Sequence, residues 1–436
     1  MSTVPQESPK LPSNEPISIL MVMRLFPGMT PIYDMPPRPP DGMPTLYKLI
    51  EGMVAAGHAV HFAGVVNPSV DHVPRTEADR QPFTVDGATY HSIRLPFSQR
   101  ISSLRIVNPV RVVFTVYKYV RLLWALSRLI RKYRPQVLYI GGPYHFLGGL
   151  CGRAFRIPTV LRFYGVQDLW SIRHSRLSYF REPWAMLAFR TSFDFAVITN
   201  DGTFGDRVAR SFGVPDDKVG FWINGVDKDA YDSSFDRRSF LKNVGIAGEP
   251  KIVMSVDRLM DWKRQDRIIR SIQHVVQSIP DALLLLVGDG PERHNLEELA
   301  RSLELQEYVR FLGSVPHSTV YGFIHSADVY VSVNDVAGVT VGTWEAIVCG
   351  RAVVTLNNGA FDGLATNDRE LVLLKQDEVD AQLGPALAEL LADEPRRERL
   401  GAAARAFAQK KLDSWESRIA REVSVLEAIA RSKRPR

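Results

Sequence analysis

The feature of this sequence that most constrains its fold is an alternation of short apolar runs with helix-like stretches, which starts twice along the chain. The first series of runs lies at residues 17–23, 60–66, 137–140, 159–163, 195–199 and 218–223. The second series lies at residues 252–256, 282–287, 309–312, 329–333, 352–356 and 371–374. Short apolar runs separated by helical spacing predict parallel strands that are covered by helices on both faces of each sheet.

The length of the chain agrees with two such units, because 436 residues exceed what a single hydrophobic core usually supports. A charged stretch at residues 228–250 separates the two series, and we interpret it as an interdomain linker. The sequence therefore predicts an α/β protein of two Rossmann-like, doubly wound domains at residues 17–225 and 226–412. Residues 1–16 are polar and rich in Pro and Ser, which is typical of a disordered leader.

Composition excludes several classes of protein. The two cysteines, Cys151 and Cys349, are too far apart in the sequence for a disulfide framework or a cysteine-based zinc site. No secretory signal is present at residues 1–16, and four cations interrupt the apolar stretch at 106–130, so no transmembrane span is expected. These features favour a cytoplasmic protein.

Two cations follow the first apolar run of the second series. Arg258 and Lys263 come after residues 252–256 and stand before a stretch with helical spacing. In open α/β sheets, ligands bind at the carboxyl ends of the strands, where helix N-termini also favour anions. Arg and Lys there would bind phosphate oxygens. A solvated pair of cations on a basic loop is the alternative that these residues leave open.

Six short motifs occur along the chain in the order that one enzyme family shows. They are Asn224-Gly225-Val226-Asp227, the R-L-x-x-x-K of Arg258 to Lys263, Gly288-Asp289-Gly290-Pro291, the V-x-F-L-G of Val309 to Gly313, the E-A-x-x-x-G of Glu345 to Gly350, and Ser414-Trp415. With this ordered set, residues 17–420 resemble the retaining GT-B glycosyltransferases of glycosyltransferase family 4.

The resemblance implies two Rossmann-like domains facing across a cleft, with a C-terminal helix at 413–436 that returns to the first domain. It implies transfer of a sugar, with retention, from a UDP- or GDP-sugar to a hydroxyl of a glycan, a glycolipid or a small metabolite. The process would be biosynthesis of a surface polysaccharide or glycoconjugate. No metal or other cofactor is expected.

The resemblance also implies roles for residues of the second domain. Arg258 and Lys263 would stabilise the departing diphosphate as its charge develops. Glu345, expected near the start of a helix-like segment at 344–348, would accept hydrogen bonds from ribose hydroxyls, with a helix-dipole role as the alternative. Gly342 and Thr343 would offer N–H groups and a hydroxyl to the diphosphate.

The nucleotide base is expected against backbone groups of three residues at a strand end, Leu312, Gly313 and Ser314. The Gly288 to Pro291 segment is expected to shape a turn rather than to touch the ligand.

In the first domain, three residues are candidates for the cleft. Gly42 lies in a loop at residues 24–44 with seven prolines, and it would allow close approach to the phosphates or would simply let the loop turn. His145 and Tyr164 follow predicted strands and are assigned to the acceptor side, although a structural histidine explains His145 equally well.

Three positions depart from the family pattern. The family places a Glu that touches the sugar eight residues before the second Glu, and here that position is Ala337, with Asp335 as a substitute. The Gly-Gly loop of the first domain is Asp41-Gly42, and the common His-Gly is Tyr164-Gly165. Ala337 favours a rival interpretation, a non-catalytic partner subunit that binds nucleotide or glycan. Arg258, Lys263 and Glu345 argue against that rival.

Two further alternatives on the same fold are a nucleotide-sugar epimerase and a phosphorylase. Residues 100–134 combine nine cations with apolar side chains, which favours either a helix at a membrane interface or a core helix with a basic outer face. The first interpretation predicts peripheral contact with the inner face of the membrane. No motif indicates a nucleic-acid partner.

Overall fold

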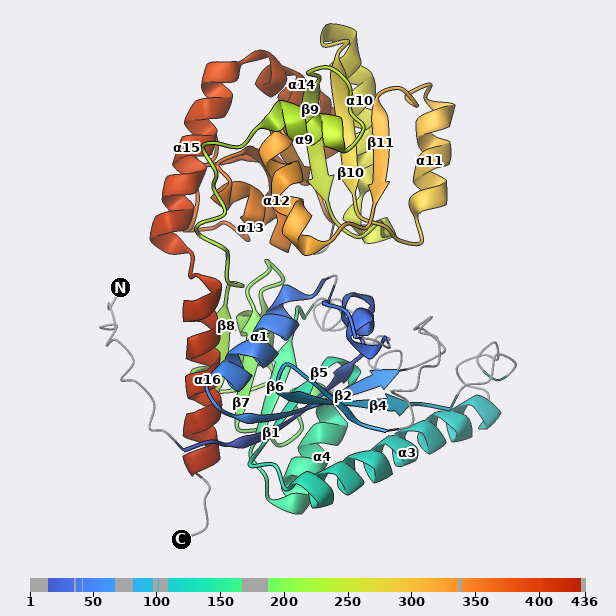
Figure 1. Cartoon of the computed structure of the whole chain (residues 1–436), viewed down its shortest axis with the longest axis vertical. Helices are drawn as coiled ribbons and strands as arrows, with labels where there is room; N and C mark the ends of the chain where they lie inside the picture. Colours follow the sequence, from blue (N-terminus) through green and yellow to red (C-terminus); the bar gives the residue numbers. More distant parts are fainter. Residues whose placement is uncertain are drawn as a thin grey trace.

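The computed structural model of the chain describes residues 15–34, 37–40, 42–66, 81–96, 101, 109–166, 187–335 and 339–432. Nearly all of the predicted leader, together with Asp41 and Ala337, lies outside these described residues. Two domains are stacked along the long axis of the molecule, and the last helix lies along the first domain, directly after the helix that packs on the second (Figure 1).

The first domain is built on one large sheet. Its strands are β1 Ser18–Arg24, β2 Ala59–Val66, β3 Phe83–Val85, β4 Ala88–Arg94, β5 Val137–Gly141, β6 Thr159–Phe163, β7 Phe195–Thr199 and β8 Val219–Trp222. Their order is β3-β4-β2-β1-β5-β6-β7-β8, and all neighbouring pairs are parallel except β3 with β4. β3 and β4 were not predicted from the sequence, because their alternating polar residues lack a continuous apolar run.

Helices cover both faces of this sheet, as the alternating pattern predicted. They are η1 Pro27–Tyr33, α1 Pro44–Ala55, α3 Pro109–Tyr133, η3 Gly142–Tyr144, α4 His145–Phe155, α8 Gly205–Ser211 and η4 Asp216–Lys218. α1 packs into the core on one face, whereas α3 and α4 pack into the core on the other. The side chains of Leu122, Leu126 and Ile130, spaced one helical turn apart, fix α3 on the sheet.

The second domain has a six-stranded parallel sheet. Its strands are β9 Lys251–Val256, β10 Ala282–Val287, β11 Val309–Gly313, β12 Val329–Ser332, β13 Ala352–Asn357 and β14 Val372–Lys375, in the order β11-β10-β9-β12-β13-β14. Counted within the domain, this is the order 3-2-1-4-5-6 of the dinucleotide-binding fold. The topological switch point lies between β9 and β12, so the carboxyl end of β9 is where that fold places a ligand.

The helices of the second half are α9 Arg237–Asn243, η5 Asp261–Lys263, α10 Gln265–Ser278, α11 Arg293–Ser302, α12 His317–Ser326, α13 Val341–Val348, α14 Val379–Ala392, α15 Glu394–Lys411 and α16 Trp415–Ser432. The prediction that residues 228–250 form only a linker is wrong, because α9 lies within them. Asp236 caps α9 by accepting the N–H of Ser239 at 3.0 Å, and Arg237 forms a 2.8 Å ion pair with Asp328 of the second domain.

The final helix returns to the first domain, as predicted. The chain crosses between the domains twice, and the two crossings pair through a bridge between Val226 and Ser414. α16 then packs against α1 and β5. Inside the first domain, the buried Glu422 forms a 2.7 Å ion pair with Arg418 and accepts a hydrogen bond from Tyr139 of β5.

The carboxyl ends of the two sheets face each other. The backbone carbonyl of Asp201, just after β7, accepts a 3.1 Å hydrogen bond from the backbone N–H of Val339, which follows β12. Lys48 of α1 lies 3.5 Å from the carboxylate of Asp227, where the chain enters the second domain. The edges at which both folds bind ligands therefore border the same space between the domains.

None of the helices in the described part of the chain is both long enough and apolar enough to cross a membrane.

Candidate active site

The loop that follows β9 holds a buried ion pair. The ammonium of Lys263 lies 2.6 Å from the carboxylate of Asp257, and the Lys263 side chain is only 8% exposed. Burial raises the pKa of Asp257, while the charge of Lys263 opposes that shift. The sequence predicted the cation but not its carboxylate partner. The pair fixes Lys263 at the carboxyl end of the strand that the switch point marks.

Arg258 differs from Lys263 in having an exposed guanidinium. No carboxylate of the described residues pairs with it, whereas its backbone is held on both sides. Its N–H donates to Asp257 at 2.9 Å, and its carbonyl accepts from the side chain of Gln265 at 3.2 Å. The site thus presents one fixed cation and one whose side chain is free to meet an anion.

The Gly288 to Pro291 segment packs against this loop. A Cβ on Gly288 would lie 2.0 Å from the carbonyl oxygen of Asp257, and one on Gly290 would lie 2.1 Å from that of Leu259. Gly288 also has a φ of 127°. Only glycine fits this approach, which supports the predicted turn-shaping role.

The N-terminus of α13 lies against the end of β9. A Cβ on Gly342 would lie 2.9 Å from the carbonyl oxygen of Val256, so glycine allows this close approach. Thr343 is fully buried, and the side chain of Thr340 accepts its backbone N–H at 3.2 Å. The two hydroxyls are 3.0 Å apart. The polar groups of Thr343 that were assigned to a diphosphate therefore serve the helix cap.

Glu345 lies in the second turn of α13, because the helix begins at Val341. The expected start of this helix at residue 344 is wrong, since Thr340 provides the cap further upstream. The carboxylate of Glu345 is buried and lies 2.7 Å from Nε2 of His317 on α12. This hydrogen bond raises the pKa of His317, although burial opposes the shift. His317, which is 28 residues away in sequence, thus orients Glu345, the residue that is predicted to bind the ribose.

Asp335 is held by two arginines. Its carboxylate oxygens lie 2.7 Å from Arg264 and 2.5 Å from Arg267, and its N–H donates to the carbonyl of Trp262 at 3.1 Å. The carboxylate assigned as a substitute sugar contact is therefore part of an ion-pair network. Ala337 itself lies outside the described residues.

The three residues assigned to the base end β11. Gly313 has a φ of 73°, and its carbonyl accepts the N–H of Gly288 at 2.8 Å. Leu312 is partly buried and Ser314 is exposed. This strand end is therefore tied to the turn that packs on the Arg258 loop.

In the first domain, Gly42 joins a tight contact between two loops. Its N–H donates to the carbonyl of Gly28 at 3.2 Å, and a Cβ on Gly28 would lie 2.8 Å from the Cα of Gly42. Gly42 stands just before α1, which carries Lys48 toward Asp227.

His145 is buried in the first domain. Its Nε2 lies 2.9 Å from the carbonyl oxygen of Arg162, its ring stacks on Phe163 at 4.1 Å, and burial lowers its pKa to about 4. These contacts favour the structural alternative for His145. Tyr164 donates a 3.3 Å hydrogen bond to the sulfur of Met23, and its ring lies beneath Arg162.

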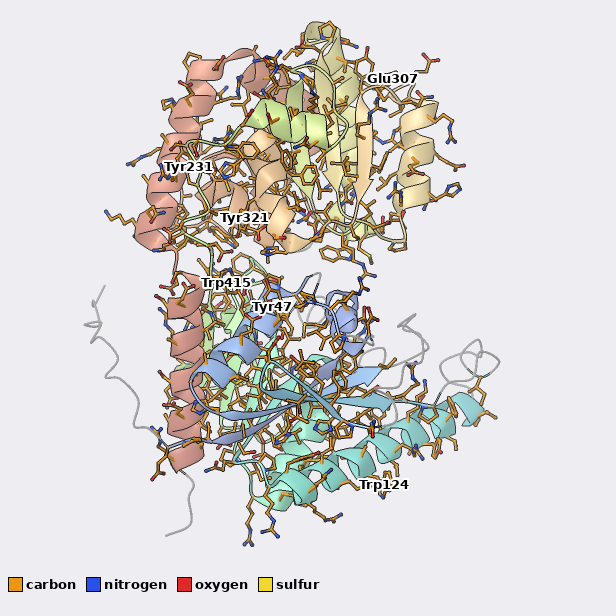
Figure 2. The ribbon with its side chains drawn as sticks, in the orientation of Figure 1. Tyr47, Trp124, Tyr231, Glu307, Tyr321 and Trp415 are labelled. Carbon is orange, nitrogen blue, oxygen red and sulfur yellow. The ribbon has the colours of Figure 1, made fainter. Side chains whose placement is uncertain are left out.

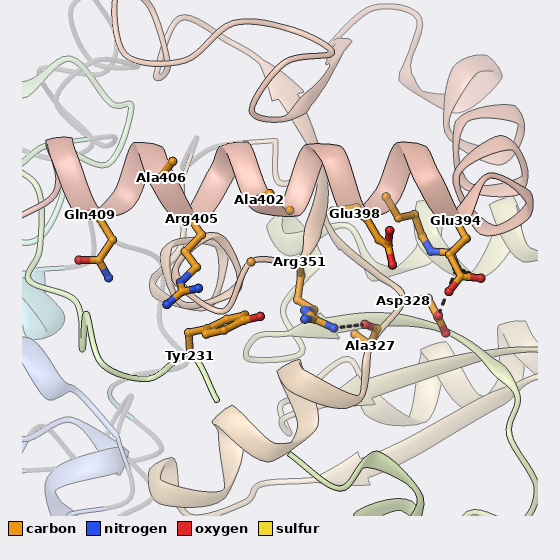
Figure 3. A pocket seen from close by; sticks show the side chains of 14 residues that line it. Tyr231, Ala327, Asp328, Arg351, Glu394, Glu398, Ala402, Arg405, Ala406 and Gln409 are labelled. Carbon is orange, nitrogen blue, oxygen red and sulfur yellow. Dashed lines mark hydrogen bonds and ion pairs between the residues drawn. The ribbon is translucent and has the colours of Figure 1, made fainter. Parts of the chain in front are cut away.

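A cavity of about 670 Å³ lies elsewhere in the second domain, between α15 and the residues that precede β12 and β13 (Figure 3). Its lining includes Asp328, Arg351, Arg397 and Arg405. Asp328 and Arg351 stand at the amino ends of their strands, which is the edge opposite to the Arg258 loop. Within the described residues, no group of three or more His, Cys, Asp or Glu side chains is placed to hold a metal ion.

Comparison with protein families assigns both halves of the chain. The glycosyl transferase 4-like domain matches residues 43–225, and the glycosyl transferases group 1 domain matches residues 236–407. Among curated relatives, a GDP-mannose-dependent alpha-(1-6)-phosphatidylinositol monomannoside mannosyltransferase of Mycolicibacterium smegmatis is 28% identical over 67% of this chain and 76% of that protein. A mannosyltransferase of Corynebacterium glutamicum, acting on monoacylated phosphatidylinositol monomannoside, is 30% identical, and the match spans 45% of this chain and about half, 52%, of that relative.

Solved structures agree with the fold. HepE of Anabaena, solved with UDP and glucose, aligns with a TM-score of 0.65 at 17% identity over 94% of this chain and 99% of that one. Sucrose-phosphate synthase of Thermosynechococcus elongatus aligns with a TM-score of 0.70 at 18% identity over 96% of this chain and all of that one, 100%. The two facing Rossmann-like domains and the returning helix define the GT-B class of folds. Within that class, the chain is a glycosyltransferase, an enzyme that transfers a hexosyl group from a sugar nucleotide.

Proposed function

We propose that this protein is a retaining, metal-independent family 4 glycosyltransferase that uses a GDP- or UDP-sugar. Its acceptor is a hydroxyl of a glycan, a glycolipid or a small metabolite in surface polysaccharide or glycoconjugate biosynthesis. GDP-mannose is the first donor to test, because the two curated relatives described above are GDP-mannose-dependent. Their acceptors are phosphatidylinositol mannosides, which favours a lipid-linked acceptor and a cytoplasmic protein at the inner face of the membrane.

The observation that carries this proposal is the unpaired guanidinium of Arg258 at the carboxyl end of β9, beside the fixed ammonium of Lys263. A departing nucleoside diphosphate gains negative charge as the sugar bond breaks, and preorganised cations stabilise that charge most in the transition state. Arg258 would bind the diphosphate from the solvent side. Lys263, held by Asp257, has two further N–H donors to offer the phosphates.

The remaining roles follow from the same geometry. Glu345, oriented by His317, would accept the ribose hydroxyls, and Gly342 lets the N-terminus of α13 approach the phosphates. Leu312 to Ser314 would lie against the base. Closure of the two domains, which already touch at Asp201 and Val339, would exclude water from the donor.

The first test is nucleotide binding measured by thermal shift and calorimetry with UDP, GDP and ADP. A nucleotide present at about a hundred times its dissociation constant should stabilise the wild type by about 2.7 kcal/mol. Arg258→Ala should lose most of this stabilisation. The matched control is Arg270→Ala, which removes an exposed arginine from α10 and should behave as the wild type.

Two rival functions give different results. A non-catalytic partner subunit, which Ala337 favours, would bind nucleotide or glycan without transferring sugar in a radiolabel assay. An epimerase would convert the donor with no acceptor present. Transfer that requires acceptor and fails in Arg258→Ala supports the transferase against both.

A further inference from the structure

α3 exposes a row of apolar side chains. In the described part of the chain, seven of the eight strongly exposed large apolar residues lie on this one helix, with exposures from 47% to 68%: Val110, Val112, Val113, Val116, Tyr117, Val120 and Trp124. The opposite face of α3 holds the buried Leu122, Leu126 and Ile130. From Val110 to Trp124 the row extends along about 21 Å of helix at 1.5 Å per residue. Such a contiguous apolar surface marks an interaction site.

The stretch of sequence that contains α3 carries charge of one sign. Residues 87–167 contain thirteen Lys and Arg residues and no Asp or Glu. The remaining chain has 41 cations against 48 acidic residues, a net charge of −7. Six of the thirteen cations are on α3. Among the described residues, Arg121, Arg128, Arg131 and Lys132 have no carboxylate partner. α3 is therefore amphipathic and basic, and no described carboxylate neutralises these four cations.

A groove opens beside the C-terminal half of α3. Its volume is about 570 Å³, and it lies between α3 and the β3–β4 edge of the sheet. Arg128, Arg131 and Lys132 line it together with Trp124, and no Asp or Glu is among the described residues of its lining. Trp124 is thus shared by the groove and the apolar row, and Figure 2 shows it on the outer side of α3.

One buried imidazole, that of His91, forms part of the inner wall of the groove. His91 is 6% exposed and lines the groove, and its Nε2 has no hydrogen-bond partner among the residues that the structure describes. Nδ1 of the neighbouring His61 also has none, and both rings lie against Tyr133, with centroid distances of 5.1 Å and 4.0 Å. A buried polar atom without a hydrogen bond costs free energy, so Nε2 of His91 is available to donate a hydrogen bond to a ligand or to accept one from it.

We propose that α3 docks this protein on an anionic phospholipid membrane, with the apolar row in the interface and the phosphate of a lipid headgroup in the groove. The inference rests on the proposed membrane-facing function and deepens it, but it uses no donor-site residue. Basic amphipathic helices bind membranes through apolar burial together with attraction to anionic lipids. Arg128 and Lys132 would bind the phosphate oxygens, and Nε2 of His91 would meet one of them.

The position of α3 agrees with this arrangement. It runs along the side of the first domain that is remote from the second domain (Figure 1). Docking there would leave the Arg258 loop and the domain contacts free. A second copy of the chain is disfavoured as the occupant, because two such helices would bring like charges together. A nucleic acid would leave the valine row without a role.

Vesicle flotation of the full-length protein tests the proposal. The protein should bind vesicles of phosphatidylcholine and phosphatidylglycerol in equal parts, and it should not bind vesicles of phosphatidylcholine alone. The double variant Arg128→Gln/Lys132→Gln should lower the partition coefficient about thirtyfold, given about a fivefold contribution from each cation near an anionic surface. The matched control is Lys410→Gln/Lys411→Gln, two exposed cations on α15, which should bind within about twofold of the wild type.

The groove has its own measurement. Titration with glycerol phosphate should shift the ring signals of His91 in the wild type and not in Arg128→Gln/Lys132→Gln. A shift without vesicle binding would mean that the groove takes a free phosphate, and it would overturn the docking proposal. So would equal losses in the test and control variants, self-association through α3 without lipid, or tighter binding to single-stranded nucleic acid than to vesicles.

The same variants separate this inference from the donor-site function. Arg258→Ala should float with vesicles as the wild type does, and Arg128→Gln/Lys132→Gln should keep the nucleotide-induced thermal shift. Vesicle binding without any nucleotide binding would reject the transferase mechanism alone. Nucleotide binding without vesicle binding would reject the docking surface alone.

Discussion

The loop after β9 and the helix α3 are both rich in cations, but the two regions differ in how many of their cations are paired with carboxylates. In and around the loop, Lys263 is paired with Asp257, and Arg264 and Arg267 share Asp335. On α3, by contrast, Arg121, Arg128, Arg131 and Lys132 have no carboxylate partner among the described residues. Pairing fixes a side chain in one geometry, which suits recognition of one ligand. Unpaired cations on long flexible side chains suit an extended anionic surface whose groups have no fixed positions.

Arg258 is the exception within the loop, and it clarifies the comparison. Its backbone is fixed by Asp257 and Gln265 while its guanidinium is exposed. The paired residues of the loop therefore hold its backbone in place, and the guanidinium of Arg258 remains available for an anionic ligand. No comparable set of ion pairs has been described on α3.

The largest effect on stability is expected from removing the carboxylate partner of Lys263. Asp257→Ala would leave the buried ammonium of Lys263 without its partner, and removing one member of a buried pair costs about 3–5 kcal/mol. Urea unfolding should show this loss of stability. Asp261→Ala, on the same loop but exposed, should change the free energy of unfolding by no more than about 0.5 kcal/mol. Equal effects of the two variants would mean that the pair does not hold the loop.

Arg258→Ala should separate catalysis from stability. Removing one stabiliser of transition-state charge costs about 2.7–4 kcal/mol, which lowers the transfer rate roughly a hundred- to thousandfold. The free energy of unfolding should stay within about 0.5 kcal/mol of the wild type, because the side chain is exposed. Steady-state transfer and urea unfolding measure the two quantities. A variant with full activity would remove Arg258 from the mechanism.

Two histidines should give opposite pH dependences. Glu345 raises the pKa of His317, and Asp227 and Lys48 are also nearby. The stability that His317 contributes to the fold is therefore present below about pH 6.5 and is lost as pH rises through the raised pKa. Burial and the neighbouring His61 and Lys132 lower the pKa of His91 to about 4. Its contribution is therefore present above about pH 6.5 and is lost as pH falls toward 4.

Melting temperature measured against pH tests this pair. His317→Gln should make the decline on the alkaline side shallower, and His91→Phe should make the decline on the acidic side shallower, because His145 and other buried histidines also contribute there. Identical slopes in the wild type and both variants would contradict the assignment of these pKa shifts.

The smallest effect is expected on α3. Arg128→Gln/Lys132→Gln removes two cations that have no carboxylate partner, so the free energy of unfolding should change by no more than about 0.5 kcal/mol. Urea unfolding beside Asp257→Ala gives the direct contrast. A large loss of stability would show that these cations hold the fold rather than face a partner.

Most of the fold follows from local patterns. The parallel strands were visible because burial on both faces demands continuous apolar runs, as in Ala282–Val287 of β10. β3 and β4 were missed because an edge hairpin needs no such run. α9 was missed because its seven residues bury little beyond Leu241, so its charged surface resembled a linker. Cap residues such as Thr340, rather than apolar spacing, decide where a helix like α13 begins.

The site was predicted only in part, for a physical reason. Sequence spacing finds residues that follow a strand, such as Arg258 and Lys263, because strand ends converge at one edge. It does not find partners that tertiary packing supplies. His317 reaches Glu345 from another helix, and the partners of Asp335 are about 70 residues away in sequence, at separations of 71 and 68. The sequence left two roles open for His145, because its contact with Arg162 comes from a neighbouring strand.

The returning helix α16 has a consequence for the order in which the protein forms. Domains generally fold as units while the ribosome works from the N-terminus onward. Here Glu422, which contacts Tyr139 of the first sheet and Arg418, is synthesised only after the whole second domain. The core of the first domain is therefore completed only after α16 has been synthesised. The second domain, whose strands and covering helices end with α15, can close before it.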